Sequence, residues 1–277
     1  MIYFSDKLTE GSKYNYAVHN LFAALANSHN EFLFIQNTRD IWMRDFMPVR
    51  TKSGRYVAFR YEPSYLNDTP ELCTEYRRDI SSQLGISVIY SDINLDGGNI
   101  VFSPSRKQAI ISDRVFSENP FCDHAALVRE LESLLEARVI IIPSLKCDMT
   151  GHADGMARFV DENTVIGNRT NHKNGLEQRI KWVLQCHGLK VVDFPYFSEG
   201  WSSAAGCYLN FLETERDIFM PVFGCEMDKK AVNMAKNISP KSIIPVNIRG
   251  IAEDGGGLNC ISWEMQRRKH EIQYIQE

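Results

Sequence analysis

The chain has 277 residues, of which 44% are hydrophobic and 24% are charged, and its formal net charge is -4. This composition is typical of a globular protein with a substantial buried core. The longest basic run, at residues 267–269, is too short to indicate nucleic acid as the main partner. The N-terminus lacks the apolar core of a signal peptide, and no stretch approaches the roughly 20 apolar residues of a membrane span. We therefore expect a cytoplasmic protein with no nucleic-acid or membrane partner.

Apolar residues recur with helical spacing in five segments, each followed within a few residues by an apolar run typical of a β-strand. The predicted helices are residues 13–28, 69–84, 123–137, 175–187 and 227–237. The predicted strands are residues 32–35, 86–90, 139–142, 190–192 and 242–246. The second helix has the clearest boundaries, with Thr69 as the N-cap, Pro70 at the first helical position and Gly85 at the end.

Each predicted strand leads into a turn and a second strand, so the unit of helix, strand, turn and strand occurs five times. Equivalent turn residues differ in number by 52, 55, 54 and 51; they are Asp45, Gly97, His152, Gly206 and Gly257. A repeat of about 50 residues predicts one α/β domain over residues 1–277 in which five units close into a ring. The five turns would then converge near the ring axis, and we expect the functional site there. The alternative is an ordinary mixed α/β domain with coincidental spacing.

The first turn, residues 38–48, places two Arg-Asp pairs around a tryptophan. Asp45 offers a carboxylate to a cation, and Trp42 offers a flat face on which a planar cation can stack. The alternative interpretation is structural, with ion pairs that stabilise the turn under an aromatic lid. The second turn, with Asp96 and the paired Gly97 and Gly98, is by itself no more than a hairpin signal.

The third turn contains His152 and Asp154, which alternation along an extended segment places on the same side. Such a pair suits an imidazole acid or base beside a carboxylate. A His-x-Asp pair could also bind a metal ion, but no other His or Cys lies at a supporting spacing, and we expect no metal. The fourth turn, residues 199–208, is rich in small residues and carries no assigned chemistry.

The fifth turn has three successive glycines, residues 255–257, shortly before Cys260. Consecutive glycines weaken local order but let the backbone approach a ligand closely. A phosphate cradle is the rival interpretation, but no lysine follows and no helix pattern begins there. Cys260 is therefore the candidate nucleophile, with an inert packing role as the alternative. The chain has 7 cysteines without metal-like spacing, and an odd number fits a reducing compartment.

Together these motifs resemble those of the agmatine deiminase and bacterial peptidylarginine deiminase family, within the guanidino-modifying pentein superfamily. The resemblance extends over residues 38–263, and its motifs run from Trp42 to Asp45, from Asp96 to Gly98, from Gly151 to Asp154 and from Gly255 to Cys260. It implies the pentein fold, a five-bladed pseudo-symmetric α/β propeller, in agreement with the repeat. Two departures are Asn259, where a histidine commonly precedes the cysteine, and Ser-Trp-Glu at residues 262–264 in place of Thr-Gln-Gln.

The resemblance also implies a hydrolase that converts the guanidinium group of agmatine or a related arginine compound into a ureido group and releases ammonia. Cys260 would attack the guanidinium carbon to form a covalent thiouronium. His152 would serve as acid and base, and Asp45 and Asp154 would hold the cation. The other implied substrate-binding residues are Trp42, Arg44, Asp96, Gly98, Asn99 and Gly257. No cofactor is needed, the expected partner is a small guanidino substrate, the pathway would be polyamine synthesis, and a homo-oligomer is left open.

Two other functions fit the same fold. An amidinotransferase passes the same thiouronium to an amine instead of water, and a non-catalytic pentein serves as a binding module. The far end of the substrate is also open, because an amine would need a carboxylate and a carboxylate would need a basic residue. The candidates are Asp96, Glu213, Glu253 and Asp254 for the first case and Arg60 and Arg249 for the second.

Overall fold

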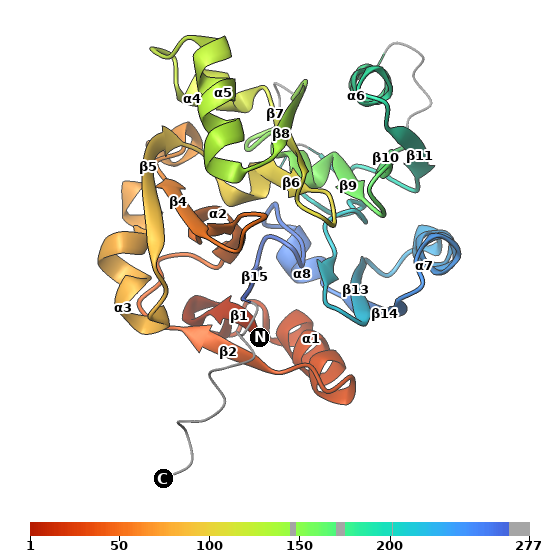
Figure 1. Cartoon of the computed structure of the whole chain (residues 1–277). Coiled ribbons are helices and arrows are strands. Elements are labelled where there is room, and N and C mark those ends of the chain that lie inside the picture. The colour runs from red at the N-terminus through yellow and green to blue at the C-terminus, as the bar shows by residue number, and fades with distance from the viewer. Residues whose placement is uncertain (145–147, 170–174, 201, 266–277) are drawn as a thin grey trace.

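The computed structural model describes residues 1–144, 148–169, 175–200 and 202–265. Within these residues the strands form five sheets of three strands each, arranged around a common centre (Figure 1). The strand orders are β15-β1-β2, β3-β4-β5, β6-β7-β8, β9-β10-β11 and β12-β13-β14. In each of these sheets the middle strand runs antiparallel to the first strand and parallel to the third.

The elements follow the same order in each unit. The first strands are β15 (Ser262–Glu264), β3 (Val49–Arg50), β6 (Ile100–Phe102), β9 (Ala157–Phe159) and β12 (Leu212–Glu213). The middle strands are β1 (Ile2–Ser5), β4 (Tyr56–Arg60), β7 (Gln108–Ser112), β10 (Thr164–Asn168) and β13 (Asp217–Val222). The third strands are β2 (Phe32–Ile35), β5 (Val88–Asn94), β8 (Arg138–Ile142), β11 (Lys190–Phe194) and β14 (Ser242–Asn247).

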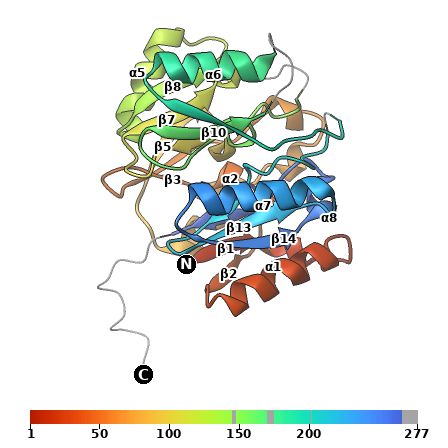
Figure 2. The ribbon, with the colours of Figure 1, turned by 90° about the vertical axis from the view of Figure 1, so that its right-hand side faces the viewer.

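The four longer helices of the described chain lie on the outside of the sheets (Figure 1 and Figure 2). The longer ones are α1 (Asn15–Asn27), α5 (His124–Leu135), α6 (Leu176–Cys186) and α7 (Glu226–Ile238). The shorter ones are α2 (Met43–Phe46), α3 (Ser81–Leu84), α4 (Arg114–Glu118) and α8 (Arg249–Ala252). Among the described residues, no helix is long and apolar enough to cross a membrane.

The predicted five-fold repeat is present, but each unit contains three strands where two were predicted. One strand was predicted between the turn and the next helix, and the structure has two strands there. β4, β7, β10 and β13 form tight antiparallel pairs with the strand before them, and β3 and β12 are only 2 residues long. Strands of 2 residues are too short to show the alternation that predicts a strand. The bounds of α1, α5, α6 and α7 agree with the predicted ones to within 2 residues.

The helix predicted over residues 69–84 is wrong as a single element, and Thr69 makes no side-chain cap. The segment contains a 3-10 turn at Pro70–Leu72, a π-helical turn at Tyr76–Ile80 and α3. Thr74 explains the break, because its buried hydroxyl oxygen accepts the backbone N–H of Arg39 at 2.9 Å. Gly85 does end the last helical turn, in the left-handed conformation (φ 60°) that glycine adopts readily.

The last described strand completes the first sheet. β15 pairs with β1, with Trp263 opposite Tyr3, and the backbone N–H of Met265 donates to the carbonyl of Met1 at 3.0 Å. The sheet therefore joins the two ends of the described chain. β15 lies near the centre of the five sheets (Figure 1). Cys260, the candidate nucleophile, precedes this strand by two residues.

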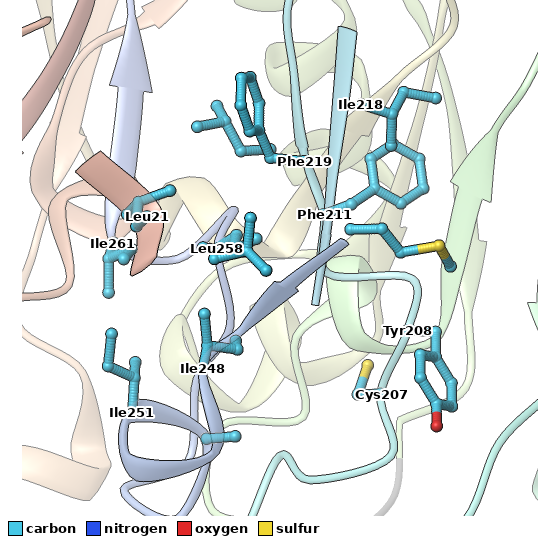
Figure 3. Close-up of a cluster of buried hydrophobic side chains, with 14 of the residues drawn as sticks. Leu21, Cys207, Tyr208, Phe211, Ile218, Phe219, Ile248, Ile251, Leu258 and Ile261 are labelled. Carbon is cyan, nitrogen blue, oxygen red and sulfur yellow. The ribbon is translucent and has the colours of Figure 1, made fainter. Parts of the chain in front are cut away.

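A buried cluster packs around the segment that carries Cys260 (Figure 3). Leu21 comes from α1 and Phe219 from β13, while Leu258 and Ile261 flank the cysteine, and all four side chains are fully buried. Burial of one such side chain contributes roughly 1.5–3 kcal/mol. The cysteine is therefore held from both sides by the core between the first and fifth units.

Candidate active site

Hydrogen bonds join the first three turns. The backbone N–H of Gly98 in the second turn donates to Oδ1 of Asp45 in the first turn at 3.0 Å. Nε2 of His152 in the third turn lies 2.6 Å from Oδ2 of Asp96 in the second turn. All four residues are buried, so these contacts are shielded from water.

The connection continues through Asn210, two residues after the fourth turn, and through the fifth turn. Nδ2 of Asn210 donates to Oδ2 of Asp154 at 2.9 Å, and Oδ1 of Asn210 accepts the backbone N–H of Cys260 at 3.2 Å. The carbonyl of Cys260 accepts the backbone N–H of Arg44 at 2.9 Å, which leads back to the first turn. These turns and Asn210 therefore meet in one closed network of hydrogen bonds, in agreement with the predicted convergence.

His152 lies between two carboxylates, with Nε2 on Asp96 and with Nδ1 3.6 Å from Oδ1 of Asp45. Burial by itself lowers the pKa of His152, but the charge of Asp45 and the hydrogen bond with Asp96 outweigh it and raise the pKa to about 10. Burial also raises the pKa of Asp45 to about 7, although the charge of His152 opposes the rise. The two carboxylates therefore favour the protonated imidazole, which can donate a proton.

The thiol of Cys260 lies against polar oxygens. Its Sγ is 3.3 Å from Oδ1 of Asn210 and 3.6 Å from Oδ2 of Asp154. Burial, followed by the charges of Asp154 and Asp45, raises the pKa of Cys260 well above its ordinary value. With these neighbours alone the sulfur stays a thiol, and a cation beside it would favour the reactive thiolate.

A cavity of about 140 Å³ brings the four predicted catalytic residues together. Asp45, His152, Asp154 and Cys260 line it, and so does Trp42. The described lining residues include five aspartates but no Arg or Lys, which makes the cavity suited to a cation. Across the described ranges, no group of three or more His, Cys, Asp or Glu side chains is arranged to hold a metal ion.

The glycines of the fifth turn permit close packing. A Cβ at Gly256 would lie 2.1 Å from the ring of Trp42, and a Cβ at Gly257 would lie 2.6 Å from Oδ1 of Asn210. Either side chain would displace the ring or the amide. Gly257, predicted to bind substrate, therefore supports the cavity wall and does not line it.

Arg44 and Asn99, also predicted to bind substrate, lie behind the cavity wall. Nη2 of Arg44 donates to both carboxylate oxygens of Glu264 at 2.8 Å. Oδ1 of Asn99 accepts the backbone N–H groups of Ser112 at 2.9 Å and Ala153 at 3.1 Å. Both side chains are thus occupied in holding neighbouring turns together, and direct contact with a substrate in the cavity is not supported for either.

Asp96 and Gly98 complete the predicted substrate-binding set, and they too are not among the residues that line the cavity. Asp96 binds His152 and also accepts the hydroxyl of Tyr65 at 3.0 Å. A Cβ at Gly98 would lie 2.5 Å from Oδ1 of Asp45 and 2.8 Å from Nδ1 of His152. These two residues therefore orient the histidine and the first-turn carboxylate.

Asn210, two residues after the fourth turn, is the central residue that the sequence interpretation missed, because no chemistry was assigned to this part of the chain. It lies 56 residues after Asp154 and 50 residues before Cys260. The repeat period was therefore the signal that could have identified it. Asn210 connects the predicted carboxylate to the predicted nucleophile, and it lines the same cavity.

Comparisons with known proteins extend these observations. The model of the family described as Porphyromonas-type peptidyl-arginine deiminase matches residues 9–265. No curated protein matches the chain. The solved agmatine deiminase of C. jejuni is 17% identical, with a TM-score of 0.76 over 95% of this chain and 92% of that chain. The agmatine deiminase of Enterococcus faecalis is 18% identical, with a TM-score of 0.72 over 95% and 92%. DDAH from Pseudomonas aeruginosa is 12% identical, with a TM-score of 0.59 over 94% and 97%.

The structural similarities show that the chain shares its α/β fold with these enzymes. The family match covers most of the chain and includes all four motifs, from Trp42 to Cys260. The chain belongs to the Porphyromonas-type peptidyl-arginine deiminase family.

Proposed function

We propose that this protein is a guanidino-group deiminase, a hydrolase that turns a guanidinium group into a ureido group and releases ammonia. The observation that carries the proposal is the single cavity lined by Cys260, His152, Asp45 and Asp154, which come from three different turns. We further propose that the five units form the five-bladed propeller of the penteins, and that residues 1–277 act as one catalytic domain.

The substrate enters as a cation, because the pKa of a guanidinium group is above 12. Asp45 and Asp154 accept its N–H groups in hydrogen bonds between opposite charges, which hold the planar cation in one orientation. The ring of Trp42 covers one face of the cation. The guanidinium carbon is then presented to the sulfur of Cys260.

Binding of the cation activates the nucleophile. The raised pKa of Cys260 keeps the free protein in the thiol form, because burial and two carboxylates oppose the thiolate. A guanidinium between those carboxylates neutralises their charge and stabilises the anion on sulfur. The thiol proton therefore passes to water when the correct substrate binds, and the sulfur is unreactive without the substrate.

The reaction proceeds in two halves. The thiolate attacks the guanidinium carbon, the imidazolium of His152 donates its proton to the departing nitrogen, and the carbon–nitrogen bond breaks to release ammonia. The substrate remains on Cys260 as a thiouronium cation. Neutral His152 then takes a proton from water, whose oxygen attacks the same carbon, and the carbon–sulfur bond breaks. The hydroxyl proton of the adduct passes to the departing sulfur, and the products are a ureido compound, the Cys260 thiol and protonated His152.

Among the described residues, three further carboxylates line the cavity. Asp40, Asp148 and Asp254 line it together with the two aspartates of the centre. Since the described lining residues include no Arg or Lys, these aspartates would repel a substrate carboxylate. This arrangement favours a substrate with a second positive charge, such as agmatine, over free arginine.

The residues predicted to bind the far end of the substrate differ in whether they line the cavity. Arg60 pairs with Glu62 at 3.9 Å and Arg249 pairs with Glu199 at 2.8 Å, and neither arginine lines the cavity. The four candidate carboxylates were Asp96, Glu213, Glu253 and Asp254. Asp254 alone among these four lines the cavity within the described chain.

The surroundings of Asp254 already accommodate an alkylammonium group. Nζ of Lys13 lies 2.5 Å from Oδ2 of Asp254, and the hydroxyl of Tyr14 donates to the same oxygen. The side chain of Lys13 is 64% exposed, so it can move away at little cost. We assign Asp254 to the amine of the substrate, which would replace the Lys13 ammonium.

Ammonia and ureido product should form from agmatine without any acceptor amine, and the kcat/KM should fall from agmatine to butylguanidine to arginine. Butylguanidine is the matched control, because it has the same carbon chain without the amine. The Asp254→Asn substitution should lower kcat/KM for agmatine roughly 10-fold and leave butylguanidine within about twofold. Steady-state kinetics with an ammonia assay provide the measurement.

Other outcomes of this experiment favour the alternatives. Product formation that depends on an added amine would identify an amidinotransferase. Binding of the guanidino compounds without any product would identify a binding module. An equal effect of Asp254→Asn on agmatine and butylguanidine would remove Asp254 from the amine site.

A further inference from the structure

Arg158 on β9 contacts the residue that precedes the nucleophile. Its Nη1 donates to Oδ1 of Asn259 at 3.0 Å. The same guanidinium lies over the ring of Phe211 at 4.5 Å and has Glu213 at 3.5 Å. Arg158 is held firmly by these neighbours but does not line the cavity. Among these neighbours, Asn259 is the one that directly precedes Cys260 in the chain.

The contact with Arg158 fixes the orientation of the Asn259 side chain. A guanidinium group carries only donors, so the amide must turn its oxygen toward Arg158 and its nitrogen away. The nitrogen, Nδ2, then donates to Oδ2 of Asp154 at 2.8 Å. An amide flipped by 180° would place its oxygen against the carboxylate and its N–H groups against the guanidinium, and both contacts would be repulsive.

A second amide converges on the same carboxylate oxygen. Oδ1 of Asn210 accepts the backbone N–H groups of Asn259 at 3.0 Å and of Cys260 at 3.2 Å, which fixes its orientation as well. Its Nδ2 therefore faces Oδ2 of Asp154, at 2.9 Å. Within the described chain, the hydrogen bonds made to Asp154 all go to Oδ2, including the one from the Cys260 sulfur. The carboxylate is thus held in one rotation, with Oδ1 left for the substrate.

We propose that Arg158 is a positioning residue for the reaction. It fixes the amide of Asn259, the amide fixes the carboxylate of Asp154, and the carboxylate presents one oxygen to the guanidinium in front of Cys260. This inference rests on the proposed deiminase function, because it assigns Asp154 to the substrate cation. It adds two residues, Arg158 and Asn259, that touch neither the substrate nor the reacting sulfur.

The isosteric substitution Asn259→Asp separates orientation from packing. The new carboxylate still accepts the hydrogen bond from Arg158, but it has no N–H for Asp154 and adds a negative charge beside it. We expect kcat/KM at pH 8 to fall roughly 100-fold or more. The deficit relative to the unsubstituted protein should shrink as the pH is lowered, because a protonated carboxyl group again has a hydrogen to donate. A purely structural defect would not produce this pH dependence.

Substitution of Arg158 tests its contact with Asn259. Arg158→Met should lower kcat/KM roughly 10-fold or more, whereas Arg158→Lys should recover part of the loss because an ammonium group also carries only donors. Glu213→Gln is the matched control. It alters the other polar neighbour of Arg158 without touching Asn259, and it should keep kcat/KM within about threefold. Thermal unfolding of all four variants reports whether each one folds.

Two results would overturn the inference while leaving the proposed function intact. One is full activity of folded Arg158→Met and Asn259→Asp variants. The other is an Asn259→Asp deficit that stays constant with pH and matches that of Glu213→Gln. Failure of the unsubstituted protein to release ammonia from any guanidino compound would instead contradict the proposed function itself. A deficit that shrinks at low pH, together with recovery by Arg158→Lys, would support the positioning role.

Discussion

The Cys260→Ser variant is expected to lose ammonia release by about 10⁴-fold or more, because an alcohol at this position cannot form the stable anion that attacks the guanidinium carbon. Binding should survive, with the Kd for agmatine within about threefold of the original. The serine hydroxyl is small and can still donate to Oδ1 of Asn210, which lies 3.3 Å from Sγ. Ammonia release and calorimetric binding measure the two effects separately.

Cys207→Ser is the matched control for this loss. Cys207 lines the same cavity, but its sulfur donates to the carbonyl of Gly155 at 3.4 Å, and burial raises its pKa to about 12. It has no place in the proposed reaction, and its variant should keep activity within about tenfold. Comparable losses in the two cysteine variants, or wild-type rates in Cys260→Ser, would remove Cys260 as the nucleophile.

The His152→Gln variant is expected to lower kcat for guanidino substrates by about 10²- to 10⁴-fold, the usual worth of a positioned acid or base. A glutamine amide can occupy the position next to Asp96, but it cannot deliver a proton to the departing nitrogen. Ammonia is a poor leaving group without that proton, so the first half of the reaction should slow most. Rapid-quench measurement of the first turnover gives this rate directly.

A substrate with a better leaving group also tests whether His152 acts as the acid, because such a group does not need a proton to depart. If the guanidinium is replaced by an S-methylisothiouronium group, the departing group is a thiolate, which leaves without being protonated first. His152→Gln should then release one equivalent of methanethiol in a burst and stall as the covalent adduct on Cys260. The acid role of His152 is wrong if the variant is equally slow with both substrates.

The features that could be predicted from the sequence are those with a local signal. The apolar spacing at residues 13–28 and 175–187 is contained within each helix, and α1 and α6 follow it closely. The His-x-Asp pair and the glycines before Cys260 likewise lie within a few residues of one another. Together with the repeat period, these signals led to the prediction that residues from four turns lie around one centre.

The features that escaped prediction depend on contacts between distant parts of the chain. The buried Thr74 interrupts an otherwise regular helical pattern by accepting the backbone N–H of Arg39. No residue near Thr74 in the sequence indicates this contact. Arg44 binds Glu264, 220 residues away, which draws its side chain out of the cavity. Tyr14 reaches Asp254 across 240 residues. Local propensity carries no information about such pairs, because the fold decides them.

The most direct test of the central claim compares two alkylating agents of nearly equal size, 2-chloroacetamidine and 2-chloroacetamide. The amidine carries a positive charge like that of a guanidinium group, and the amide is neutral. If the carboxylates of Asp45 and Asp154 hold a cation that converts Cys260 to its thiolate, the amidine should modify Cys260 at least roughly 100-fold faster. Ammonia release should fall in proportion to the fraction of Cys260 that is modified. Peptide mass spectrometry measures that fraction. Equal rates for the two agents, or full activity with Cys260 completely modified, would contradict the account.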